Sequence, residues 1–188
     1  MRKKLLQFSK TSFILFLFLL SNTITSAKNN YFVKGNLEDI RPHLYEAKKV
    51  EKDVLKKLIQ SVEKYQSVPY RYGGCSVKGV DCSGFVKMIY QEFFNINVPH
   101  GSRNQLHYGH KVDKDDLRPG DLIFFKMGSR IGHVGIYLAD GFFVSAESMR
   151  GIGICHINSI YWQKKYVTAK RLLNLSVPKS LQYRKIKS

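Results

Sequence analysis

One cysteine and one histidine are the residues of this 188-residue chain best suited to nucleophilic chemistry. Cys82 follows Asp81, a good helix N-cap residue, and apolar residues recur after it at helical spacing. The cysteine is therefore predicted in a first helical turn, where free N–H groups and the helix dipole should lower its thiol pKa below about 8.5. The alternative is that Cys82 is a small buried hydrophobe, the usual fate of a free cysteine.

The histidine, His133, lies in an apolar run over residues 131–138 that predicts a strand. In such a strand His133 shares a face with Gly135 and Tyr137, so the imidazole points at the Cys82 helix if that helix packs on this face. An imidazole beside a thiol can act as its general base. The alternative is a core histidine whose ring binds a backbone carbonyl.

These two residues belong to a longer series of short motifs. The series runs PYRYGG (69–74), DCSGFV (81–86), PHGS (99–102) with Gln105, LRPGDLIFF (117–125), GHVGIY (132–137), and YW (161–162) with AKR (169–171). In order and spacing, these six blocks resemble the NlpC-type cell-wall peptidase family over residues 50–173. Six blocks in order are a far more specific signal than any one tetrapeptide.

The resemblance implies an α+β, papain-like fold, with N-terminal helices packed on a central antiparallel sheet. It implies a cysteine peptidase that cleaves peptidoglycan stem peptides, typically between D-glutamate and a diamino acid. Carried over by position, Cys82 is the nucleophile and His133 the general base. Tyr70 is implied in the oxyanion site or in substrate positioning, and Asp81 and Ser83 in holding a substrate amino group. The alternatives are a core aromatic for Tyr70 and plain helix capping for Asp81 and Ser83.

The sequence departs from the family pattern at the third catalytic residue. The family has a histidine twelve positions after the first, and here that position is Ser145. Glu147 lies two residues further along the same predicted strand and faces the same side. Because a carboxylate would fix the tautomer of the base and stabilise the imidazolium, Glu147 is the preferred third residue and Ser145 the alternative. Glu147 could instead be a solvated loop charge, and His156 is a third candidate.

A second departure is His100, which stands where the family usually has an arginine, a change that bears on subsite preference.

The two ends of the chain differ from its middle. Residues 1–27 have a basic start, an apolar centre and a small-residue end, which is typical of a cleaved secretory signal peptide rather than a membrane span. An uncleaved N-terminal anchor is the alternative. Residues 28–49 are expected to be a linker or N-terminal arm, residues 50–173 the peptidase domain, and residues 174–188 a basic tail. The protein is therefore expected in the periplasm, the cell envelope or the medium.

The chain carries a formal net charge of +17, and removal of the signal peptide would leave about +13. Such a charge favours anionic envelope polymers as partners beside the stem peptides, whereas no nucleic-acid motif is present. An odd number of cysteines in an exported protein fits a reactive Cys82 and permits a Cys75–Cys155 disulfide. No cysteine and histidine spacing resembles a zinc site, and no cofactor is expected.

Two other functions fit the same residues. One is a secreted amidase toxin directed at the wall of another cell. The other is a wall-binding protein whose altered third residue has weakened or abolished catalysis.

Overall fold

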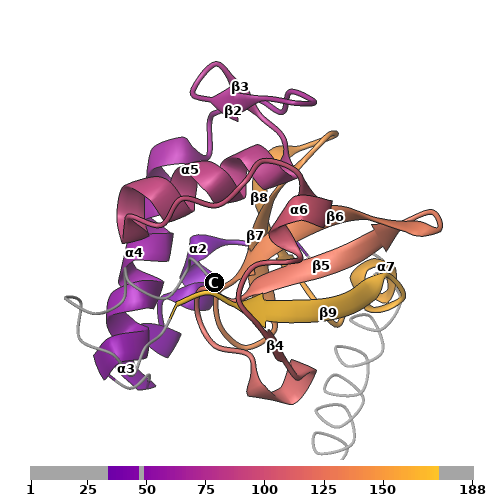
Figure 1. Cartoon of the computed structure of the whole chain (residues 1–188). Coiled ribbons are helices and arrows are strands. Elements are labelled where there is room, and N and C mark those ends of the chain that lie inside the picture. Colours follow the sequence, from indigo (N-terminus) through magenta and orange to yellow (C-terminus); the bar gives the residue numbers. More distant parts are fainter. Residues whose placement is uncertain (1–33, 47–48, 174–188) are drawn as a thin grey trace, which may run out of the picture.

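The computed structural model describes residues 34–46 and 49–173, which are coloured by sequence in Figure 1. The expected signal peptide, the basic tail and part of the expected arm lie outside the described residues. Among the helices that are described, none combines the length and the apolar character needed to cross a bilayer.

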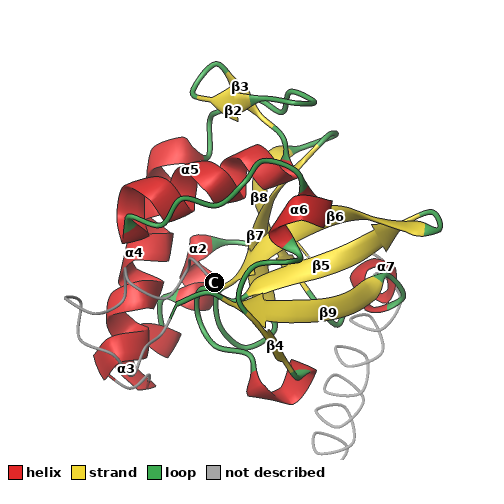
Figure 2. Cartoon of the chain, viewed as in Figure 1, coloured by secondary structure: helices red, strands yellow, loops and turns green. Residues whose placement is uncertain are grey.

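A seven-stranded antiparallel sheet forms the centre of the described part (Figure 2). In space the strands run in the order β1, β8, β7, β6, β5, β9 and β4. Their bounds are β1 Lys34–Gly35, β4 His110–Val112, β5 Leu122–Met127, β6 Arg130–Tyr137, β7 Phe142–Glu147, β8 Gly151–His156 and β9 Tyr166–Arg171. A separate hairpin of β2 (Cys75–Ser76) and β3 (Gly79–Val80) stands above the sheet.

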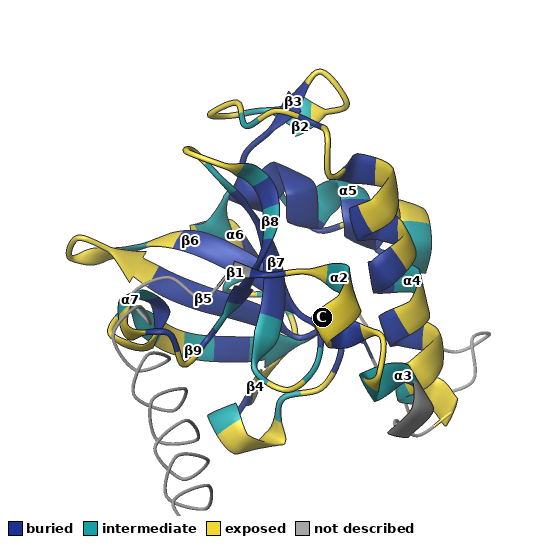
Figure 3. Cartoon of the chain, turned by 180° about the vertical axis from the view of Figure 1, so that it is seen from behind, coloured by how far each residue is buried: buried dark blue, intermediate teal, exposed yellow. Residues whose placement is uncertain are grey.

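Two long helices cover one face of this sheet (Figures 1 and 3). They are α4 (Lys49–Tyr65) and α5 (Cys82–Phe94). The shorter elements are α2 Leu37–Ile40, α3 His43–Glu46, α6 Ser102–Gln105, α7 Ile160–Gln163 and the 3₁₀ turn η1 Lys114–Asp116. The α+β arrangement of helices against an antiparallel sheet is the one that the sequence predicts.

The helical face of the sheet holds the larger hydrophobic core. Buried residues of α4 recur every three or four positions, as an amphipathic helix requires, and α5 buries its own apolar face beside them. Both helices pack on alternate residues of the central strands, including Phe124, Val134, Ile136 and Val144. Each such side chain contributes about 1.5 to 3 kcal/mol on burial, so this core fixes where α5 lies.

The opposite face carries a smaller aromatic core around Trp162. The ring of Trp162 packs against Phe125 and Phe143 of the sheet, with centroid distances of 4.6 and 5.3 Å. The short helix α7 therefore packs on the opposite face of the sheet from α4 and α5; Figure 2 shows it near the end of β9.

Residues 34–46 are packed on the domain. Strand β1 pairs with Ile154 and Cys155 at the edge of the sheet, and Ile40 of α2 is fully buried. The Asn36 side chain caps α2, and the Asp39 carboxylate accepts a hydrogen bond from the backbone N–H of Asn36. The absence of periodicity in this segment gave no sign of the strand pairing, which depends on tertiary contact.

Candidate active site

Cys82 is the first residue of α5, as predicted, and its side chain is only 8% exposed. Asp81 is the N-cap residue in an extended conformation, and its carboxylate accepts a hydrogen bond from the N–H of Gly84. A Cβ at Gly84 would lie 2.0 Å from the carbonyl oxygen of Gly74, so only glycine lets the upstream loop close on this first turn. The loop and the cap together hold Cys82 at the tip of the helix.

The carboxylate of Asp81 is the centre of a hydrogen-bond network. Oδ1 accepts from the Ser83 hydroxyl at 2.8 Å and lies 3.0 Å from Nε2 of His100, while Oδ2 accepts from the N–H of Gly73 at 3.0 Å. Burial alone would raise the pKa of Asp81, but the hydrogen bonds from Gly84, His100 and Ser83 hold it below its ordinary value. Asp81 is therefore a carboxylate at neutral pH.

Two residues of this network were not predicted as site residues. His100 contacts Asp81 directly, and Gln105 is fully buried and donates to the carbonyl oxygens of Ser83 and Pro99. The Ser83 hydroxyl in turn accepts from the N–H of Gly101. Both residues lie in a matched motif block, which was the one signal in the sequence that could have pointed to them.

The N-terminus of α5 meets the sheet where β6 and β7 separate. These strands pair at Ile136–Val144 and Tyr137–Phe143, and α5 contacts both strands. The backbone N–H of Val134 is near enough to the sulfur of Cys82 to favour its thiolate form. Since Val134 directly follows His133, the predicted nucleophile Cys82 lies beside the stretch of β6 that carries the expected base.

The predicted lowering of the Cys82 pKa is wrong for this structure. Burial raises the pKa of the thiol to about 11, even though the N–H groups of Val134, Ser83 and Cys82 itself favour the thiolate. Desolvation of the charged form outweighs the helix terminus because the sulfur is almost enclosed. At neutral pH Cys82 is a thiol, and it needs a base to become a nucleophile.

His133 is buried and uncharged at neutral pH. Its ring stacks on Trp162 with centroids 5.0 Å apart. Burial lowers the pKa of His133 to about 4; the charge of Lys165 also lowers this pKa, and the charge of Asp81 raises it. Nε2 has no hydrogen-bond partner among the described residues. A neutral imidazole has one unprotonated ring nitrogen, which is able to accept a proton.

The relation of the two side chains differs from the one expected. The helix of Cys82 packs on the Val134 and Ile136 face of β6, whereas His133 leaves the strand toward Trp162 on the other face. Side chains alternate between the two faces of a strand, so when Val134 and Ile136 face the core under α5, His133 must face the other side. The two side chains thus approach one stretch of β6 from its two sides, and no hydrogen bond joins them in the described structure. Catalytic hydrogen bonds often form only when substrate is bound.

Tyr70 lies on the helical side, near the nucleophile. It bridges to Val80, packs on the larger core and is partly exposed. Burial raises the pKa of its hydroxyl, and the neighbouring charge of a Cys82 thiolate would raise it further. A hydroxyl that stays protonated beside the sulfur is a suitable hydrogen-bond donor.

Ser145 and Glu147, the two candidates for the third residue, both lie on β7 and on the His133 side of the sheet. The Ser145 hydroxyl is fully buried and has no partner among the described residues. One oxygen of Glu147 accepts a hydrogen bond from the Cys155 thiol at 2.6 Å. The alternative candidate His156 instead contacts the carbonyl oxygen of Asp140, at the far end of β7.

The Cys75–Cys155 disulfide is not formed, since all three cysteines are free. Cys75 lies on the hairpin against Gly84, and Cys155 lies under Trp162 on the opposite face of the sheet. The sheet itself separates the two sulfur atoms.

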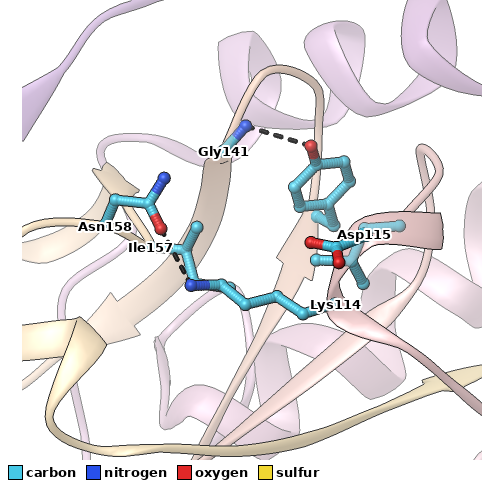
Figure 4. Close-up of a pocket in the computed structure, with 7 residues that line it drawn as sticks. Lys114, Asp115, Gly141, Ile157 and Asn158 are labelled. Atoms are coloured by element: carbon cyan, nitrogen blue, oxygen red, sulfur yellow. Dashed lines mark hydrogen bonds between the residues drawn. The ribbon is translucent and has the colours of Figure 1, made fainter.

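Within residues 34–46 and 49–173, no cluster of His, Cys, Asp and Glu side chains could hold a metal ion. A polar pocket of about 190 Å³ lies at the other end of β6, where Lys114 bonds Asn158 and the N–H of Gly141 donates to the Tyr137 hydroxyl (Figure 4). These polar groups satisfy one another, and none of the predicted site residues lines this pocket.

Comparison with known proteins identifies the family of this chain. The NlpC/P60 family matches residues 67–171. The chain is 39% identical over 124 residues to the murein DD-endopeptidase MepS/murein LD-carboxypeptidase of Escherichia coli K12, a match that spans 66% of each chain. It is 34% identical over 125 residues to the gamma-DL-glutamyl hydrolase of Bacillus subtilis, where the match spans 65% of this chain and 30% of the relative.

A solved structure gives the same result. The crystal structure of an NlpC/P60 family protein from Bacillus cereus superposes with a TM-score of 0.58 at 33% identity, covering 62% of this chain and 39% of the other. The predicted papain-like fold and the predicted enzyme class, a cysteine-type peptidase that hydrolyses peptidoglycan, are confirmed by these matches. The chain belongs to the NlpC/P60 family.

Proposed function

We propose that the protein is an exported cysteine endopeptidase that cuts peptidoglycan stem peptides between D-glutamate and a diamino acid through a thioester on Cys82. The observation that carries this proposal is the position of the sulfur. It sits in the first turn of α5, near the N–H of Val134 and beside the strand segment that carries His133. Export is inferred from the signal-like pattern of residues 1–27.

The reaction starts from two neutral groups. His133 takes the proton of the Cys82 thiol as the sulfur attacks the peptide carbonyl, and the imidazolium then gives that proton to the departing amine. Water, deprotonated by the same imidazole, hydrolyses the thioester and restores the thiol. Because burial favours the neutral form of both residues, we infer that charge develops only as the substrate arrives.

Substrate recognition is assigned to the side of Cys82 that carries Asp81. This carboxylate is charged and partly accessible, with its orientation fixed by four hydrogen bonds. It can attract a substrate ammonium group, while Ser83 keeps it in place. We assign the Tyr70 hydroxyl to the oxyanion, since it is protonated and near the sulfur.

For the third residue the burial pattern gives Ser145 more support than the sequence did. The Ser145 hydroxyl and Nε2 of His133 are both buried, unpartnered among the described residues, and on one face of the sheet. Glu147 already binds Cys155 through one oxygen. The kinetics of Ser145→Ala and Glu147→Gln distinguish the two assignments.

The name of the Escherichia coli relative favours a second bond, the D,D-amide that crosslinks two stem peptides. Both bonds can be tested in one experiment. Purified protein is incubated with crosslinked and uncrosslinked muropeptides, and the products are identified by mass. We expect cleavage after D-glutamate by the wild type and none by Cys82→Ala or His133→Ala. Cleavage of crosslinks alone would replace the proposed bond, and full cleavage by Cys82→Ala would exclude the thioester.

A further inference from the structure

The indole of Trp162 covers one face of the His133 imidazole. The two rings stack with their centroids 5.0 Å apart and their planes at 24°, and the ring of Phe125 lies 6.1 Å from the imidazole at a tilt of 47°. Both His133 and Trp162 are buried. Because buried side chains are close-packed, an imidazole enclosed in this way has few orientations open to it. The plane of the imidazole therefore follows the plane of the indole.

Three further aromatic contacts hold the indole itself. The ring centroids of Phe125, Tyr161 and Phe143 lie 4.6, 4.8 and 5.3 Å from that of Trp162. The Tyr161 and Phe143 rings stand at 88° and 84° to the indole, the edge-to-face geometry that aromatic pairs favour. These contacts are apolar, whereas a buried tryptophan N–H usually has a polar partner as well.

The thiol of Cys155 is that polar neighbour. Burial, followed by the charge of Glu147, raises the pKa of Cys155, so the group is a thiol at neutral pH. The thiol donates a hydrogen bond to Oε1 of Glu147, with 2.6 Å between sulfur and oxygen. The indole N–H of Trp162 acts the other way and lies near enough to the sulfur to favour its thiolate form. The sulfur therefore links the Glu147 carboxylate to the indole.

The register of β7 and β8 brings these groups to one face of the sheet. Phe143 pairs with Cys155, and Glu147 lies four residues after Phe143 on the same strand, so the three side chains project to the same side. Cys155 and Trp162 belong to the same small core. Cys155 lies outside the six motif blocks, and the proposed reaction gives it no part. Its position nevertheless connects it to the general base through a single side chain.

We propose that Cys155 is a positioning residue for the general base: its thiol aligns the indole of Trp162, and the indole aligns the imidazole of His133. This inference rests on the proposed function, in which His133 takes the proton of Cys82. The stack restrains the plane of the imidazole, whereas a hydroxyl such as that of Ser145 can act only on the edge of the ring. A chain with serine at the expected third position thus has a second means of holding its base.

The first test compares Cys155→Ala with Cys155→Ser, two variants that differ by one hydroxyl group, on muropeptides. Cys155→Ala removes the polar link and should lower kcat by about tenfold with little change in KM, because a misplaced base slows the chemical step. Cys155→Ser keeps a donor for Glu147 and an acceptor for the indole N–H, so it should recover most of the wild-type kcat. Ile157→Val trims the same small core by one methyl group and should leave kcat unchanged. Circular dichroism checks that each variant folds.

A double-mutant cycle tests the path through the indole. Trp162→Phe keeps an aromatic ring but has no N–H group, and it should lower kcat at least as much as Cys155→Ala. The double variant should lose little more than Trp162→Phe alone, because both changes break the same contact. Losses that simply multiply would show that Cys155 does not act through Trp162 and would overturn the proposal.

Fluorescence reports the stack without catalysis, because Trp162 is the single tryptophan of the chain. A protonated imidazole quenches an indole that it contacts. Burial lowers the pKa of His133 to about 4, so an acid titration should show a step near pH 4 in the wild type and none in His133→Gln. In Cys155→Ala the step should move toward pH 6.5, since a looser stack lets water reach the ring. Cys155→Ser should keep the step near pH 4.

The outcomes separate this proposal from the proposed function. An unchanged kcat and an unshifted fluorescence step in Cys155→Ala would overturn the positioning role and leave the proposed function standing. A loss that is equal in Cys155→Ala and Cys155→Ser, or that falls on KM alone, would overturn it too, because neither follows from a misaligned base. Absence of cleavage by the wild type would instead overturn the proposed function.

Discussion

Acid should destabilise this fold through His133. Burial lowers the pKa of His133 to about 4, whereas an imidazole in the unfolded chain titrates near 6.5. Above pH 6.5 neither state binds the proton, so the stability is unaffected there. Between pH 6.5 and 4 the unfolded chain takes up a proton that the folded chain does not, and stability is lost as the pH falls through this range.

The size of the effect follows from the two pKa values. Their difference corresponds to about 3 kcal/mol of unfolding free energy once the pH is well below both. At pH 5 the loss relative to pH 7 should be about 2 kcal/mol, a substantial part of the 5 to 15 kcal/mol typical of a domain. Protonation of His133 is opposed first by its burial and then by the positive charge of Lys165.

Urea unfolding at pH 7 and pH 5 measures this loss. The transition is followed by circular dichroism and by the fluorescence of Trp162, the single tryptophan of the chain, which is stacked on His133. Wild type should lose about 2 kcal/mol more than His133→Gln between the two pH values. The exposed-histidine control His110→Gln should behave as wild type. An equal loss in wild type and His133→Gln would refute the argument that burial keeps this imidazole neutral.

Three more outcomes are expected. The rate at which iodoacetamide alkylates Cys82 should rise about tenfold per pH unit between pH 7 and 10, as measured by peptide mass analysis. A rate that is flat above pH 7 would indicate a preformed thiolate. If Ser145 orients the imidazole, Ser145→Ala should lower kcat with little change in KM on muropeptides, and Glu147→Gln should not. Asp81→Ala should cost about 1 to 2 kcal/mol in urea unfolding through loss of the helix cap, and unchanged stability would contradict that role.

The fold and the position of Cys82 at a helix start were predictable because local signals agree with tertiary structure. Asp81 before an apolar helical pattern placed Cys82 at a helix start, and the β-branched run around His133 indicated the strand that the structure contains. The motif series fixed their order and spacing. These signals are local, and the helix start and the strand that they predict are present in the folded structure.

Other features depend on contacts that the sequence does not reveal. The pKa of Cys82 is set by how completely α5 is buried at the gap between β6 and β7, which reverses the prediction from the helix terminus alone. The face on which α5 packs is chosen by Val134 and Ile136 rather than by His133. The contact between Glu147 and Cys155 likewise depends on the pairing register of β7 and β8, which the sequence does not reveal.

Trapping the acyl-enzyme shows whether Cys82 forms a thioester with the substrate. Wild-type protein is mixed with uncrosslinked muropeptides, quenched in acid within the first turnovers and digested for mass analysis. We expect a stem-peptide fragment ending in D-glutamate, attached as a thioester to the peptide that contains Cys82 and absent in Cys82→Ala. Two results would contradict the thioester on Cys82. One is product formation without an adduct in the wild type, together with undiminished turnover in Cys82→Ala. The other is an adduct on Cys75 or Cys155.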